Sequence, residues 1–336
     1  GEIYNFKELR KRLVEFQFKT NSDTEVLIYW LIKYGGDNLN EIQGMFSFCF
    51  YDKETNEIIL GRDQLGIKPL YYSLNENEFI FSSDINSLKI ISGSKITVDK
   101  NCIQDFLQLG YMIEPNTGFK NISKVPPGSI LKYNILNERL ILIEYWNPLI
   151  EIGIKRNHEK LNLIIEKSIQ NQLISDVPLG VFFSGGIDSS IIASKMPKNS
   201  QFLISENNAD ELKQAGINND SFYASKIAEI FNIKLIRLKV DDEKIDFLKT
   251  IEEIVHLNEE LISDYTSHPT FKLSQKAREI GLSVMLSGMG ADEIFAGYPR
   301  YLMMRYYSLF KRVSFVTPFL QKRPFFQKKI ERFLGF

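Results

Sequence analysis

The chain has 336 residues, of which 44% are hydrophobic and 25% charged, a composition typical of a globular protein with about two domains. The 41 basic and 42 acidic residues leave a formal net charge of −1, so charge gives no reason to expect nucleic acid or an anionic membrane as a partner. No apolar run is as long as a membrane span, and two cysteines are too few for a disulfide framework or a zinc cluster. The first residues carry no secretory signal, and we expect a cytoplasmic enzyme.

The first 150 residues combine helical patterns with paired strands. Apolar spacing predicts a helix over residues 5–16, and Ser22 and Glu25 form a capping-box pattern that opens a second helix ending near Gly35. The apolar period then changes to two, which predicts strands over residues 45–50, 57–61, 70–73, 78–82, 129–133 and 139–144, with a hairpin turn at residues 75–77. Helices beside paired strands indicate an α+β layered domain.

Four motifs in this half resemble the class II glutamine amidotransferases. They are G-E-I-Y-N at Gly1, N-S-D-T-E-V around Asp23, Q-G-M-F-S-F at Gln43 and G-R-D-Q-L-G-I-K-P-L-Y-Y at Gly61. The resemblance implies an N-terminal-nucleophile hydrolase sandwich, in which Gly1, Glu2 and Asp23 bind glutamine. From the residues alone, an acid favoured by the helix dipole is the simpler interpretation of Asp23.

The nucleophile of that family is an N-terminal cysteine, which the resemblance places upstream of Gly1. Cys49 lies in an alternating pattern and is interpreted as a packed strand residue, while Cys102 lies at the edge of a predicted helix. We therefore expect no catalytic residue for glutamine hydrolysis within this chain. Because the chain lacks a first methionine and Phe336 follows no clear stop signal, we expect a fragment truncated at both ends.

The second half alternates between helix and strand after a predicted linker at residues 148–157. Apolar patterns predict helices over residues 161–173, 221–231, 245–258 and 271–280, and strands over residues 181–183, 202–205, 234–240 and 282–286. This order predicts a doubly wound parallel sheet, with ligands at the carboxyl ends of its strands. We place the domain boundary at residue 150, which gives domains over residues 1–150 and 151–336.

The motif S-G-G-I-D-S-S, which starts at Ser184, follows a predicted strand and opens a predicted helix. Its two glycines allow a tight turn, and Asp188 or Ser189 is the expected N-cap. Backbone N–H groups at the positive end of the helix dipole, together with the serine hydroxyls, favour an anion, and Asp188 could hold the accompanying cation. The alternative is an ordinary strand-to-helix turn; the lysine of the common kinase-type loop is absent.

A second loop, S-G-M-G-A-D-E from Ser287, has the same order of strand, glycine turn and helix. Two glycine loops at one sheet edge could face a triphosphate from two sides. Asp188 and Asp292 could then share Mg²⁺, which usually binds one or two carboxylates plus phosphate oxygens. Taken alone, the second loop is equally well explained as a helix start with acids in its first turn.

The first loop is similar to the pyrophosphate loop of the N-type ATP pyrophosphatases, and the two halves together resemble the asparagine synthetase family over nearly the whole chain. The resemblance implies that ATP, Mg²⁺, glutamine and aspartate bind as small molecules, with no nucleic acid and no membrane partner, and it leaves a homodimer open. The implied reaction forms β-aspartyl-AMP and pyrophosphate, after which ammonia from glutamine displaces AMP. The resemblance assigns ATP binding to Phe182, Ser184, Gly185, Gly186, Asp188, Ser189, Ser190, Ile204, Ser287 and Gly288, and metal binding to Asp188 and Asp292.

One position departs from the family pattern, because Met289 stands where many members carry a glutamate implicated in forming the intermediate. Methionine cannot act as a base or as a cation ligand, so either a neighbour such as Glu293 substitutes or the acceptor is not aspartate. A relative acting on another carboxylate, in a polysaccharide or antibiotic pathway, is one alternative, and a non-catalytic ATP-binding fragment is another. A tRNA-thiolating enzyme is less favoured, because the second half contains no cysteine.

Overall fold

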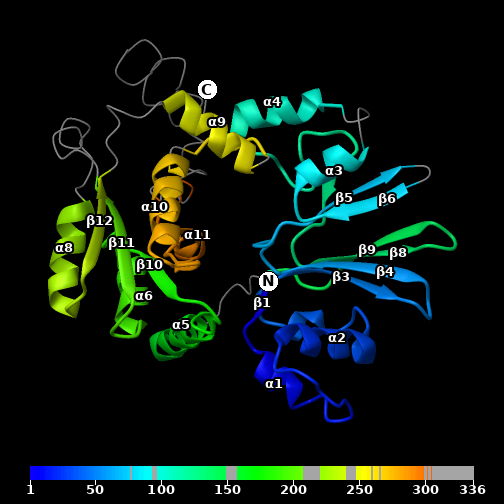
Figure 1. The fold of residues 1–336 in the computed structure, drawn as a ribbon, viewed down its shortest axis with the longest axis horizontal. Helices are drawn as coiled ribbons and strands as arrows, with labels where there is room; N and C mark the ends of the chain where they lie inside the picture. The colour runs from blue at the N-terminus through cyan, green and yellow to red at the C-terminus, as the bar shows by residue number, and fades with distance from the viewer. Residues whose placement is uncertain are drawn as a thin grey trace. The chain divides into compact units, whose positions relative to one another are not determined.

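The computed structural model describes residues 1–75, 78–92, 97–148, 157–206, 220–239, 247–258, 260–264 and 266–298, with residues 301 and 304 (Figure 1). The chain forms two compact units. Unit 1 comprises Gly1–Ile174 and Asp246–His268, and unit 2 comprises Ser175–Ile245 and Pro269–Phe336. Within the described ranges, we find no helix that has both the length and the apolar character needed to cross a membrane.

Unit 1 contains antiparallel strands that fall close to the predicted places, except for two short strands at residues 2–3 and 123–124 that were not predicted. A four-stranded sheet has the order β3-β4-β8-β9, a three-stranded sheet has the order β6-β5-β7, and β1 pairs with β2. The predicted strand over residues 45–50 is divided at Phe46, because the Phe46 N–H bonds to the Asp63 carboxylate. The strands are β1 (Glu2–Ile3), β2 (Gly44–Met45), β3 (Ser47–Asp52), β4 (Glu57–Arg62), β5 (Tyr71–Asn75), β6 (Glu78–Ser82), β7 (Ser123–Lys124), β8 (Ser129–Asn134) and β9 (Arg139–Glu144).

The described helices of unit 1 depart from the predicted bounds at the N-terminus. The first helix ends at Arg10 instead of residue 16, and Leu13 and Phe16 follow in tight turns whose N–H groups bond three residues back. Leu13 is therefore buried at the same apolar spacing as in a helix, although the chain there is not helical. The helices are α1 (Phe6–Arg10), α2 (Asp23–Tyr34), the 3₁₀-helix η1 (Leu39–Glu41), α3 (Ile85–Ser92), α4 (Lys100–Leu109), α5 (His158–Gln172) and α9 (Phe247–Asn258).

The predicted capping box at the start of α2 does not close. The Ser22 hydroxyl accepts a hydrogen bond from the Thr24 N–H, as an N-cap should. The Glu25 carboxylate, however, accepts from the N–H groups of Lys19 and Thr20 instead of returning to Ser22. Gly35 ends the helix with φ of +61°, as predicted.

Unit 1 is built in four layers, in the order helix, sheet, sheet, helix (Figure 1). Ile59 and Ile130 face α1 and α2, whereas their strand neighbours Leu60 and Leu131 face the three-stranded sheet. On the far side of that sheet, α3 packs against Tyr71. This order agrees with the α+β sandwich that the sequence predicts.

Unit 2 contains a four-stranded sheet of order β12-β11-β10-β13, in which every pairing is parallel. Ala193 of α6 and Ala224 of α8 pack on one face, and Leu273 and Ala277 of α10 pack on the other. The doubly wound parallel sheet is therefore confirmed. Its elements are β10 (Leu179–Phe182), α6 (Ile187–Lys195), β11 (Gln201–Glu206), α8 (Asp220–Phe231), β12 (Leu235–Lys239), α10 (Ser267–Glu279), β13 (Val284–Leu286) and α11 (Ala291–Phe295).

Some predicted features lie outside the described residues. They are part of the hairpin turn at residues 76–77, most of the linker at residues 149–156, and the ends of the predicted strand and helix at residues 240 and 245–246. The helix that was predicted over residues 245–258 is seen as α9, and it belongs to unit 1 although its neighbours in the sequence belong to unit 2.

Candidate active site

The first glycine loop, Ser184–Gly186, joins β10 to α6 through a turn that requires glycine. Gly185 has φ of +75°, and a Cβ atom there would lie 2.3 Å from the backbone nitrogen of Ala224. A side chain would therefore displace α8, and the positive φ adds strain for any residue other than glycine. Gly186 occupies the N-cap, so the predicted N-cap at Asp188 or Ser189 is wrong: both residues lie in the first turn of α6.

The serine hydroxyls of this loop have different surroundings. Ser184 is exposed, and its Oγ lies 3.1 Å from the Oγ of Ser189 and accepts the Gly186 N–H at 3.3 Å. Ser189 is 3% exposed, and its hydroxyl donates to the Gly186 carbonyl at 3.2 Å. Ser190 Oγ is buried without a hydrogen-bond partner among the described residues. Ser189 therefore stabilises the turn, whereas Ser184 and Ser190 keep hydrogen-bonding capacity.

The second glycine loop, residues 287–290, lies against the first. β13 pairs in parallel with β10, with Leu286 opposite Val181, so both strands end at the same sheet edge. A Cβ atom on Gly288 would lie 2.8 Å from the Cβ of Asp188 and 3.1 Å from the Ser189 backbone nitrogen. The two loops, which are far apart in the sequence, are therefore in contact at Gly288, as expected.

Two carboxylates begin the helices that follow these loops, Asp188 in α6 and Asp292 in α11. Neither carboxylate has a hydrogen-bond or ion-pair partner in the part of the chain that the structure describes. The same part contains no group of three or more His, Cys, Asp or Glu residues that could hold a metal alone. One or two carboxylates with phosphate oxygens are the usual ligands of Mg²⁺, so this donor set fits a cation that arrives with a nucleotide.

The side chains of Phe182 and Ile204 lie on opposite faces of the sheet. Phe182 pairs with Leu203 and packs with it toward α10, whereas Ile204 is 3% exposed and packs with Val181 on the other face. Their side chains therefore point to opposite faces of the sheet, and the assignment of both residues to ATP stays a prediction.

The predicted glutamine-binding residues come together in unit 1. The Asp23 Oδ2 atom accepts the Ile3 N–H at 2.9 Å, which places the start of α2 beside the strand that carries Glu2. Glu2 lies opposite Met45 in the β1–β2 pair. A Cβ atom on Gly1 would lie 2.9 Å from the Met45 carbonyl oxygen, so the backbone at Gly1 approaches that strand closely.

Comparison with known proteins identifies the two halves. Residues 1–146 match a sequence model described as a glutamine amidotransferase domain, and residues 160–334 match one described as asparagine synthase. The chain belongs to the asparagine synthase family. Asparagine synthetases (glutamine-hydrolysing) 3 and 1 of Bacillus subtilis are 32% and 30% identical to it, over 89% and 90% of this chain and 51% and 47% of their own.

These relatives are longer than the chain, which spans about half their length. A relative from Methanocaldococcus jannaschii is 30% identical over 90% of this chain and 58% of its own. A solved glutamine phosphoribosylpyrophosphate amidotransferase from B. subtilis is 14% identical over 85% of this chain and 59% of its own. Its TM-score of 0.30 is too low to establish a shared fold.

Met289 remains a departure within the asparagine synthase family match. Its side chain is 81% exposed at the second glycine loop, and its N–H donates to the Ser287 hydroxyl at 3.4 Å. Glu293 is also exposed, and its Oε1 atom accepts the hydroxyl of Tyr298 at 2.9 Å. Glu293, the expected substitute for a loop glutamate, thus already has one hydrogen-bond donor.

Neither cysteine of this family member lies in an activating environment. Cys49 lies on β3 as predicted, but its side chain is exposed, so the prediction that it is packed is wrong. Cys102 is 5% exposed in α4. Partial desolvation of Cys49 by its strand neighbours and burial of Cys102 raise the pKa of both thiols above the ordinary value, which favours the unreactive protonated form.

Asp63, which no sequence motif had singled out, organises the loop that follows β4. Asp63 is fully buried, and its two oxygens accept four backbone N–H groups, from Phe46, Leu65, Ile67 and Lys68. An aspartate directly after an apolar strand and shortly before a glycine, as in G-R-D-Q-L-G, is the signal that could have revealed it.

Proposed function

We propose that this chain is the ATP-binding and glutamine-binding part of a glutamine-dependent asparagine synthetase. The contact of Gly288 with Asp188 and Ser189 carries the proposal, because it joins two glycine loops at one edge of a parallel sheet, and each loop leads into a helix whose first turn carries an unpaired carboxylate. Such an edge, where strands lead into helix N-termini, is the usual place for phosphate groups in doubly wound sheets. The family match over residues 160–334 supports ATP as the nucleotide.

In the first step, a carboxylate oxygen of aspartate attacks the α-phosphorus of ATP. The bond from that phosphorus to the oxygen bridging to the β-phosphate breaks, which gives β-aspartyl-AMP and pyrophosphate. We assign the first-turn N–H groups of α6 and the hydroxyls of Ser184 and Ser190 to the phosphates, where negative charge builds up on the leaving pyrophosphate. Asp188 and Asp292 would hold Mg²⁺, which neutralises phosphate charge when bound.

In the second step, ammonia attacks the acyl carbon of β-aspartyl-AMP, loses a proton, and displaces AMP to give asparagine. Hydrolysis of glutamine to glutamate supplies the ammonia. We assign the recognition of glutamine to Gly1, Glu2 and Asp23, because an acid held beside a strand end can pair with the α-amino group of an amino acid. Adenylation is needed because a free carboxylate is a poor acyl donor, and AMP is a better leaving group. We propose that the enzyme acts in the cytoplasm.

The test is ATP–pyrophosphate exchange by the full-length protein, measured with a panel of amino acids and sugar acids. Exchange that requires aspartate supports asparagine synthesis. Exchange with another acid and none with aspartate refutes it, and leaves a glutamine-dependent amidotransferase with a different acceptor.

A different acceptor is the second candidate, and the exposed Met289 side chain is the observation that favours it. Met289→Glu restores a carboxylate to the second loop. If the natural acceptor is not aspartate, this change should raise exchange with aspartate and lower exchange with the natural acid. If Glu293 already supplies the carboxylate, Glu293→Gln should reduce aspartate-dependent exchange in the unchanged loop.

A further inference from the structure

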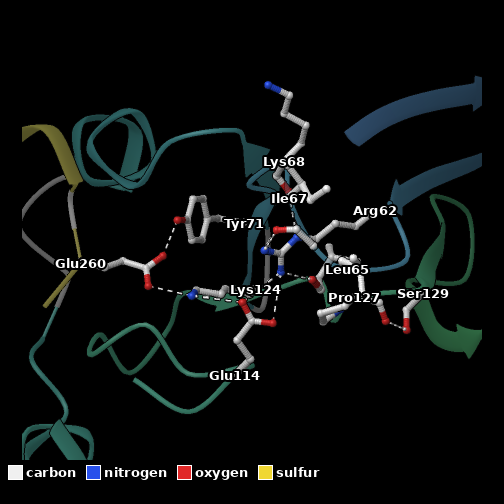
Figure 2. Close-up of polar contacts among 12 residues, drawn as sticks. Arg62, Leu65, Ile67, Lys68, Tyr71, Glu114, Lys124, Pro127, Ser129 and Glu260 are labelled. Atoms are coloured by element: carbon white, nitrogen blue, oxygen red, sulfur yellow. Dashed lines mark hydrogen bonds and ion pairs between the residues drawn. The ribbon is translucent and has the colours of Figure 1, made fainter. Parts of the chain in front are cut away.

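A carboxylate from the asparagine synthase half is held by two donors from the amidotransferase half. Glu260 Oε1 accepts the hydroxyl of Tyr71, and Glu260 Oε2 lies 2.7 Å from the Lys124 ammonium (Figure 2). Tyr71 and Lys124 are directly opposite each other on β5 and β7, so their side chains lie on the same face of that sheet. The side chains of Lys124 and Glu260 are each 11% exposed. Two fixed donors thus match the two oxygens of one buried carboxylate.

The Lys124 ammonium is itself fixed by further charges. It lies 3.2 Å from Glu114 Oε1, and the same carboxylate lies 3.3 Å from the guanidinium of Arg62 (Figure 2). Three other N–H groups of Arg62 donate to backbone carbonyls at 2.8 Å. Two acids and two bases therefore balance in this cluster, and the donors that hold Glu260 are rigidly placed.

The segment around Glu260 has a second attachment in unit 1. The Ser263 N–H donates to the carbonyl of Gly110, the C-cap of α4, at 2.7 Å. The division between the units then falls after His268, inside α10, which begins at Ser267. α10 leads to β13 and so to the second glycine loop. Glu260 therefore holds the last part of unit 1 that the chain passes through before it reaches that loop.

We propose that Glu260 is a positioning residue that attaches the segment before α10 to the amidotransferase unit and thereby couples glutamine use to pyrophosphate release. The attachment stands on contacts within unit 1, whereas the coupling rests on the function proposed above. Coupling is expected because the carboxylate belongs to the part of the chain that leads to the ATP loops, while its partners belong to the part that binds glutamine. Removing Glu260 should release the segment without changing either set of ligand-binding residues.

The experiment compares Glu260→Ala with Glu253→Ala in the full-length protein. Glu253 is an exposed acid of α9, so the control removes the same side chain from the same segment. Lys124 retains Glu114 as a partner in Glu260→Ala, and Tyr71→Phe offers a milder variant that deletes only the hydroxyl. Hydrogen exchange of residues 247–264 is measured first, and the ratio of glutamate to pyrophosphate released is measured second.

We expect hydrogen exchange of residues 247–264 to accelerate at least about tenfold in Glu260→Ala, by less in Tyr71→Phe, and not at all in Glu253→Ala. The product ratio should rise at least about threefold in Glu260→Ala, while pyrophosphate release driven by added ammonia changes less than about twofold. A purely structural role would lower both activities together. Equal exchange in Glu260→Ala and Glu253→Ala would refute the attachment, and an unchanged product ratio would refute the coupling.

Failure of the proposed function gives a different result. If the unchanged protein shows no aspartate-dependent ATP–pyrophosphate exchange, aspartate is not the acceptor, but hydrogen exchange still tests the attachment. The ratio of glutamate to pyrophosphate is then measured with the acid that does support ATP–pyrophosphate exchange, so that it still tests the coupling.

Discussion

Gly185→Ala should damage unit 2 more than an ordinary glycine substitution, because it introduces two separate costs. An alanine at φ of +75° costs about 1–2 kcal/mol in backbone strain. Its Cβ would also lie 2.3 Å and 2.5 Å from backbone atoms of Ala224, which cannot rotate away as a side chain can. Forcing α8 aside adds roughly 1–3 kcal/mol, the range found for overpacked sites. The total is about 2–5 kcal/mol.

Gly281→Ala is the matched control, because Gly281 has φ of +84° and nothing within 4 Å of the added Cβ. It should lose only the strain of about 1–2 kcal/mol. Thermal unfolding followed by calorimetry should place the midpoint of Gly185→Ala below that of Gly281→Ala by several degrees, at roughly 2–4 °C per kcal/mol for a domain of this size. Equal midpoints would show that the close contact between Gly185 and α8 does not add to the loss of stability in Gly185→Ala, and would refute the reasoning.

Three further predictions test the other features. Asp188→Ala should weaken Mg-ATP binding at least about tenfold in calorimetry, because it removes a proposed Mg²⁺ ligand. The unfolding midpoint should not change, because the carboxylate has no partner among the described residues. Unchanged affinity for Mg-ATP would contradict the proposed role. Asp63→Asn should cost about 3 kcal/mol in denaturant unfolding, since an amide can accept only part of the four N–H groups, and Asp37→Asn, at an exposed aspartate, should cost almost nothing. The 336-residue chain should release no glutamate from glutamine. Iodoacetamide should modify Cys49 at a rate that still increases above pH 9, because the pKa of its thiol is raised. Cys102 is buried and should react only when the protein unfolds.

The elements that sequence periodicity predicted well are those with long, uniform patterns. α2 and the parallel strands combine a clear apolar period with a cap or a glycine at the end, so their positions follow from local chemistry. The first helix was overestimated because successive three-residue turns place Leu13 and Phe16 at the same apolar spacing as a helix. The N-cap of α6 was misplaced because a glycine cap has no side chain to signal it.

The candidate site was predictable only in part, because strand register is not visible in one sequence. The two glycine loops could be placed at one edge, since carboxyl ends of parallel strands share an edge. That Phe182 pairs with Leu203, and so lies on the face opposite Ile204, depends on a register that no local pattern specifies. Asp63 was not predicted for a related reason, because its carboxylate accepts four backbone N–H groups that come together only in the folded loop.

Arg62 and Asp63 are consecutive residues, and together they connect the β1–β2 pair, which carries Glu2, to the contacts around Glu260. Asp63 accepts the Phe46 N–H and donates its own N–H to the Phe46 carbonyl, directly after the strand β2 that pairs with Glu2. Burial, followed by the charges of Glu2 and Asp63, raises the pKa of Tyr4, the residue that follows β1. Arg62 lies in the ion-pair cluster that holds Glu260. A shift of the β1–β2 pair would therefore strain the buried Asp63, whose neighbour Arg62 lies in the cluster that holds Glu260. This continuity gives the proposed coupling a physical route within unit 1.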